Sequence, residues 1–131
     1  MVQKDKELLL KDLCARLPYG VKCEIDEERK VGTLFQINAC SVSINEDCFD
    51  HLVINCKPYL FPLSSMTEEQ KVEFGKMAEL DTEYIITQIK NDAPNWTSGL
   101  SRFNWLLKNH FDVYGLIPMG LALDATGKNI Y

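Results

Sequence analysis

The chain has 131 residues, of which 46% are hydrophobic and 25% are charged, the balance of an ordinary soluble globular protein. This length predicts a single globular domain over residues 1–131. The apolar runs fall far short of the ~20 residues that span a bilayer, and the first residues lead into an amphipathic segment without a signal-peptide core. We therefore expect a cytoplasmic protein with no membrane association.

The formal net charge of −5 is concentrated in the middle of the chain. Residues 31–100 hold four basic and ten acidic side chains, whereas residues 1–30 hold seven of each. A protein without a basic stripe cannot neutralise a phosphate backbone. The charge pattern therefore argues against nucleic acid as a partner held through a basic surface.

The five cysteines are an odd number and include no CxxC pair, which favours small buried hydrophobes in a reducing compartment over a disulfide framework. Cys40, Cys48, His51 and Cys56 lie within 17 residues of one another. Their spacing, C-x7-C-x2-H-x4-C, matches no compact zinc motif. We expect free thiols, no metal and no cofactor.

The apolar positions of residues 4–17 recur with the helical period, which predicts an N-terminal helix. Arg16 falls among the polar positions, and Pro18 with Gly20 ends the helix. The face predicted to be buried consists of Leu10, Leu13, Cys14 and Leu17.

From Val21 the apolar period changes to two, which predicts strands. The first strand is paired in a hairpin with residues 31–39, whose side chains Phe35 and Ile37 are predicted to face the core. The apolar phase then moves to even-numbered positions, so we expect a bulge or a break near Ala39 and Cys40.

A further strand is predicted where Leu52, Ile54 and Cys56 alternate with polar residues. Pro58 and Pro62 cannot donate hydrogen bonds to a strand ladder, so residues 59–61 are predicted to form an edge strand or an extended loop. The strands together predict a short meander.

Helical periodicity returns after two overlapping capping boxes, Ser65 with Glu68 and Thr67 with Gln70. One helix, or two in series, should extend to about residue 90, and a last helix covers residues 100–110. These elements predict an α+β fold: an N-terminal helix, a three- or four-stranded antiparallel meander, and two or three helices packed on one face of the sheet.

A polar cluster near the end of the chain forms one candidate site, which comprises His110, Asp112, Tyr114 and Asp124. These residues would form a general-base or ligand-binding cluster if the tail folds back on the last helix. Asp124 also begins a D-x-T-G sequence after an apolar run, as strand-end aspartates of phosphoryl-transfer enzymes do. The structural alternatives are a turn built by Asp124 and a helix cap at His110.

Trp105 carries a second candidate site. Helical geometry places it on the side of its helix opposite Phe103, where Arg102 and Lys108 frame it. An exposed indole beside two cations is typical of a contact with a protein partner. The alternative is that the apolar tail, residues 116–123, covers this side of the helix and buries the indole.

Three stretches have distinctive sequences: residues 13–21, residues 57–70, and residues 109–111 with 115–127. They resemble a family of small uncharacterised proteins of gut Bacteroidales genomes and their phages or mobile elements. The resemblance covers close to half of the chain and implies an intracellular bacterial or phage setting. The family has no known activity, so the resemblance implies no cofactor and no site residue.

Two functional hypotheses follow. The first is a non-catalytic interaction or regulatory protein, encoded by a mobile element, whose surface includes Arg102, Trp105 and Lys108 or the acidic helix that begins at Glu68. The second is a small enzyme or ligand-binding domain with its site at His110, Asp112 and Asp124. A concave pocket that joins these three would favour the second hypothesis, and a convex aromatic patch would favour the first.

Overall fold

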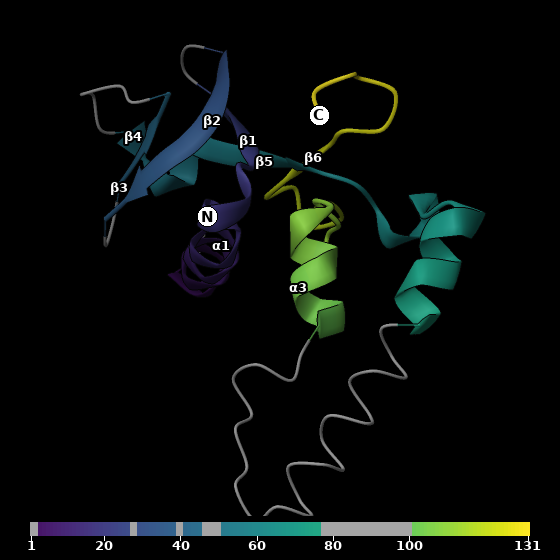
Figure 1. Cartoon of the computed structure of the whole chain (residues 1–131). Helices are drawn as coiled ribbons and strands as arrows, with labels where there is room; N and C mark the ends of the chain where they lie inside the picture. Colours follow the sequence, from purple (N-terminus) through teal and green to yellow (C-terminus); the bar gives the residue numbers. More distant parts are fainter. Residues whose placement is uncertain (1–2, 27–28, 39–40, 46–50, 77–100) are drawn as a thin grey trace, which may run out of the picture.

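A computed structural model describes residues 3–26, 29–38, 41–45, 51–76 and 101–131. These ranges form a mixed fold in which an N-terminal helix packs against one face of a six-stranded sheet (Figure 1). The strand order is β4-β3-β2-β1-β5-β6, and every pairing is antiparallel except that of β5 with β6. The predicted α+β class and N-terminal helix are confirmed, but the sheet has more strands than expected.

Helix α1, Gln3–Arg16, is followed by a 3-10 turn, η1, at Leu17–Tyr19. The chain then reverses at Gly20, whose φ of 69° is the left-handed conformation that glycine tolerates. The buried face of α1 differs from the predicted one, because Cys14 is exposed and Arg16 is fully buried. The residues of α1 that are buried are Leu9, Asp12, Leu13 and Arg16.

Strands β1, Lys22–Ile25, and β2, Lys30–Ile37, form the predicted hairpin, but the register of β2 is not the predicted one. Because Cys23 pairs with Gly32, the even-numbered residues at the start of β2 share the core face of β1. Leu34 is therefore buried and Phe35 is 50% exposed, so the prediction of a core Phe35 is wrong.

Strand β3, Ser41–Ile44, pairs with β2 across a bulge between Leu34 and Gln36. The bulge reverses the alternation, so Ile37 returns to the core side opposite Val42 and is half-buried there. The break predicted near residues 39–40 lies outside the described residues.

Strand β4, His51–Leu52, forms one edge of the sheet, and the 3-10 turn η2, Val53–Asn55, separates it from β5, Cys56–Leu60. The predicted single strand through Leu52, Ile54 and Cys56 is therefore wrong. The turn carries the chain beyond β3, β2 and β1, so that β5 lies inside the sheet rather than at an edge. Strand β6, Leu123–Asp124, pairs with the end of β5.

Residues 68–76 are helical and begin at the second predicted capping box. The backbone N–H of Thr67 donates to Gln70 Oε1 at 2.9 Å, and the N–H of Gln70 donates to Thr67 Oγ1 at 3.2 Å. Ser65 instead ends the 3-10 turn η3, Leu63–Ser65, and its hydroxyl donates to the Pro62 carbonyl. The predictions for residues 77–100 lie outside the described residues.

Helix α3, Ser101–Lys108, contacts α1, and Figure 1 shows both helices on the same side of the sheet. Phe74 of the helix over 68–76 packs against Trp105 of α3, with 5.8 Å between ring centroids. In the described part of the chain, no helix has both the length and the apolar character needed to cross a bilayer.

Arg16 forms a buried ion pair within α1 and also links this helix to the chain that follows α3. Arg16 Nε lies 2.7 Å from Asp12 Oδ1, and both side chains are fully buried. Arg16 Nη2 also donates to the carbonyl of Phe111, 95 residues away in the sequence. Burial raises the pKa of Asp12, and the hydrogen bond from Arg16 opposes that shift.

Candidate functional site

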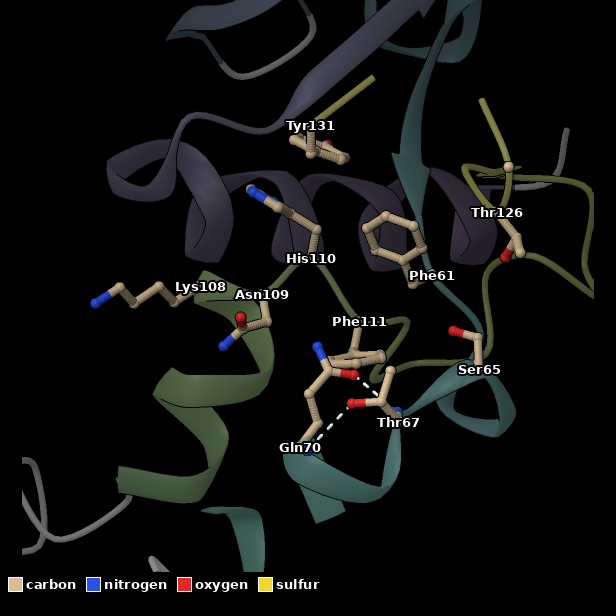
Figure 2. Close-up of a pocket in the computed structure, with 11 residues that line it drawn as sticks. Phe61, Ser65, Thr67, Gln70, Lys108, Asn109, His110, Phe111, Thr126 and Tyr131 are labelled. Atoms are coloured by element: carbon tan, nitrogen blue, oxygen red, sulfur yellow. Dashed lines mark hydrogen bonds between the residues drawn. The ribbon is translucent and has the colours of Figure 1, made fainter. Parts of the chain in front are cut away.

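A pocket of about 440 Å³ lies where the end of β5, the start of the helix over 68–76, the end of α3 and the C-terminal residues meet (Figure 2). Ring-bearing side chains form one part of its lining: Phe61, His110, Phe111 and Tyr131. Amide, hydroxyl and ammonium groups form another: Ser65, Thr67, Gln70, Lys108, Asn109 and Thr126. The volume falls within the range of about 300–1,000 Å³ typical of small-molecule sites.

The C-terminal cap of α3 brings His110 and Phe111 into this pocket. His110 has a φ of 64°, its N–H donates to the Leu107 carbonyl, and the N–H of Phe111 donates to the Leu106 carbonyl. These two bonds with a left-handed residue define a Schellman cap. The structural alternative of a helix cap at His110 is therefore confirmed for its backbone.

The chain beyond the cap runs beside Phe61. The N–H of Phe61 donates to the His110 carbonyl at 2.8 Å, and the N–H of Asp112 donates to the Phe61 carbonyl at 2.9 Å. A parallel bridge thus extends the β5 side of the sheet to the end of α3. This backbone pairing fixes the positions of the Phe61 and Phe111 rings, whose centroids lie 6.3 Å apart.

Tyr131 closes the pocket by stacking on His110, with 3.7 Å between ring centroids and 10° between ring planes. Its hydroxyl donates to the Tyr59 carbonyl at 2.7 Å and accepts the N–H of Lys22 at 2.8 Å. Burial of this hydroxyl raises the pKa of Tyr131. The hydroxyl therefore stays protonated and ties the ring to β1 and β5.

The imidazole of His110 is uncharged at neutral pH. Burial, together with the nearby positive charges of Arg16 and Lys22, lowers its pKa from 6.5 to about 4. Nδ1 is buried and has no hydrogen-bond partner among the described residues. The ring thus presents a neutral aromatic surface to the pocket rather than a cation.

The other members of the predicted polar cluster do not join His110. Asp112 is 7% exposed and accepts the N–H groups of Leu116 at 2.8 Å and Ile117 at 3.0 Å. Asp124 is exposed and accepts the N–H of Thr126, which is the turn given as its structural alternative. Asp112 and Asp124 thus stabilise turns and, unlike His110, do not line the pocket.

Tyr114, the remaining member, packs elsewhere. Its ring meets Phe103 edge-on at 6.3 Å between centroids, and Lys11 Nζ lies 5.3 Å from the Tyr114 centroid. This group joins α1 to α3 and to the tail. Tyr114 therefore has a packing role in the structure.

Trp105 is 6% exposed, so the prediction of an exposed indole as a partner contact is wrong. It stacks on Phe111 with 5.8 Å between centroids and a 19° interplanar angle, and Phe74 covers another part of the ring. Arg102 and Lys108 are exposed, and Lys108 lines the pocket. Trp105 thus supports Phe111, one of the pocket rings, from behind.

The described residues contain no group of three or more His, Cys, Asp or Glu side chains able to hold a metal ion. Cys40 and Cys48 of the zinc candidate lie outside the described residues. Of the described cysteines, Cys23 and Cys56 are buried and free, whereas Cys14 is free and exposed.

Most pocket residues were not predicted as site residues from the sequence. The T-x-x-Q capping box signalled the position of Gln70, and the end of the last helix signalled His110. The roles of Phe61 and Tyr131 had no such signal, because 70 residues separate them. Comparisons with protein-family models, curated proteins and solved structures give no match to this chain.

Proposed function

We propose that this protein is a small, non-catalytic ligand-binding domain whose pocket lies between β5, the helix over 68–76, the end of α3 and the C-terminal residues. The observation that carries the proposal is the pocket itself, about 440 Å³ in volume, which is lined by both aromatic rings and polar side chains. Such a combination gives a ligand both apolar contact area and fixed hydrogen-bond directions.

Binding without turnover fits the groups in this pocket. A general base of the histidine–carboxylate type needs a carboxylate that orients the imidazole. In the described residues no carboxylate hydrogen-bonds His110, and both oxygens of Asp112 are engaged by backbone N–H groups. The stacked, neutral imidazole supplies a surface for a ring rather than a route for protons.

The test is a fragment screen followed by ligand-detected NMR, using the wild type, Thr126→Phe and Ser64→Phe. Thr126 is exposed and lines the pocket, so a phenylalanine there fills part of the cavity. Ser64 is also exposed but does not line this pocket, so it controls for adding an apolar ring. We expect hits that Thr126→Phe removes and Ser64→Phe retains. Hits that survive both changes, or no hits, would contradict the proposal.

A second function, interaction with a protein partner in the cytoplasm, is favoured by a different surface. Val31 is 44% exposed, Phe35 50% and Leu52 54%. Strand alternation places all three on the sheet face opposite α1. A regulatory protein of this kind would lose capture of its partner from a host lysate on Phe35→Ser, with no loss on Thr126→Phe. Equal capture by both variants would contradict this second proposal.

A further inference from the structure

We propose that the pocket takes an uncharged planar ring that carries an amide or lactam group, an inference that rests on the ligand-binding function proposed above. The inference comes from the hydrogen-bonding groups that the lining residues retain after their own internal bonds. The groups of interest are the side-chain amides of two lining residues, Gln70 near the start of the helix over 68–76 and Asn109 at the end of α3.

Gln70 supplies a donor. Its Oε1 accepts the N–H of Thr67 at 2.9 Å, so the oxygen is held in the capping box. The NH₂ group remains for a ligand, since the described residues provide it with no partner. Figure 2 shows this nitrogen pointing away from Thr67, toward Asn109 and Phe111.

Asn109 supplies the complementary acceptor. Its Nδ2 donates to the Trp105 carbonyl at 2.9 Å, which fixes the side chain at the end of α3 and leaves Oδ1 for a ligand. Figure 2 shows Oδ1 on the side of the amide nearer His110. An amide or lactam complements the hydrogen-bonding character of this pair, because it carries both a carbonyl that can accept from Gln70 and an N–H that can donate to Asn109.

The rings and the charges of the pocket define the rest of the ligand. Phe61 and the stacked His110 and Tyr131 offer apolar ring surface that favours a planar ring, whereas Phe111 is 2% exposed and adds little surface of its own. Among the described lining residues Lys108 carries the charge at neutral pH, and Figure 2 shows its side chain extending away from the others. The ligand therefore gains little from a negative charge.

The experiment is an NMR titration of ¹⁵N-labelled protein with nicotinamide and uracil, which supply the same amide chemistry from a carboxamide and from a lactam. Two ring-matched comparators are 3-acetylpyridine, which keeps the carbonyl but lacks the N–H, and nicotinate, which is charged. We expect the side-chain NH₂ signals of Gln70 and Asn109 to shift with nicotinamide, uracil or both. Both comparators should bind about tenfold or more weakly.

Two variants make the test specific. Gln70→Glu keeps a carboxyl oxygen for the capping box but removes the NH₂ donor, so binding should fall about tenfold with little change in melting temperature. Lys71→Gln makes the same change in net charge on the same helix outside the pocket lining and should bind normally. Amide and comparator rings that bind equally would overturn the amide inference alone. A protein that binds none of these probes and none of the screened fragments would overturn the pocket function as well.

Discussion

Adjacent residues of one strand, Leu34 and Phe35, have opposite environments. Leu34 is 3% exposed on the core face, and Phe35 is 50% exposed on the other. The sequence assigned Phe35 to the core because its apolar alternation continues through residues 31–39. The alternation alone could not reveal that β1 and β2 pair through Cys23 and Gly32, since glycine contributes no hydrophobicity to the core face.

The two residues give a matched stability test. Leu34→Ala removes buried methyl groups and should lower the free energy of unfolding by about 2–5 kcal/mol. Phe35→Ala removes a larger side chain from a half-exposed site and should cost less than about 1 kcal/mol. Urea denaturation followed by circular dichroism measures both. A larger loss for Phe35→Ala than for Leu34→Ala would contradict the β2 register.

His110 should make stability depend on pH. Its pKa is about 4 in the folded protein and 6.5 ordinarily, so the unfolded chain binds a proton between these values that the folded protein does not. The neutral, buried imidazole therefore does not lower the free energy of unfolding above pH 6.5. As the pH falls from 6.5 toward 4, proton binding to the unfolded chain lowers that free energy progressively. In His110→Asn, which tolerates the left-handed backbone, the melting temperature should fall less over this range. Parallel pH profiles would contradict the shifted pKa.

The capping-box motif predicted the start of a helix more accurately than the alternation of apolar and polar residues predicted the strands. The Thr67–Gln70 box forms as its sequence indicates, because both hydrogen bonds are local and need no tertiary partner. The path from β4 to β5 could not be predicted in this way. Residues 52–57 alternate like one strand, yet η2 interrupts them and Cys56 pairs across the sheet with Ile25.

Substitution by alanine is expected to have opposite effects on stability at two glycines, Gly32 and Gly75. A Cβ at Gly32 would lie 2.6 Å from Cγ of Asn45, whose Oδ1 accepts the N–H of Thr33. Gly32→Ala must displace this amide and should cost about 1 kcal/mol through the lost hydrogen bond. A Cβ at Gly75 meets nothing within 4 Å, so Gly75→Ala should stabilise the helix by up to about 1 kcal/mol.

Thermal unfolding of the two variants measures whether Gly32→Ala lowers the melting temperature and Gly75→Ala raises it. The background variant Asn45→Gly keeps the positive φ of 51° accessible and removes the obstructing amide. Gly32→Ala should cost much less in that background than in the wild type. An undiminished cost would show that the contact between β2 and Asn45 is not its cause.

The whole molecule depends on bonds between segments that are far apart in the sequence. The pocket combines residues from 61 to 131, and Arg16 ties α1 to the carbonyl of Phe111 at its base. Periodicity predicted the elements that carry these residues, whereas their juxtaposition depends on tertiary pairing. Arg16 illustrates the limit. A helix wheel places Asp12 and Arg16 one turn apart as a possible ion pair, but it cannot foresee that both side chains are buried or that Arg16 also reaches the carbonyl of Phe111.

The buried ion pair between Asp12 and Arg16 predicts that removing both partners lowers stability less than removing Arg16 alone. Arg16→Met leaves the buried carboxyl of Asp12 unpaired and should lower the free energy of unfolding by about 3–5 kcal/mol, less if that carboxyl becomes protonated. Adding Asp12→Leu removes the unpaired group, and because a buried ion pair can be replaced by apolar residues at little cost, the double variant should recover most of the loss. Chemical denaturation at pH 7 measures all three proteins. A double variant less stable than Arg16→Met would show that the carboxyl of Asp12 stabilises the fold independently of Arg16.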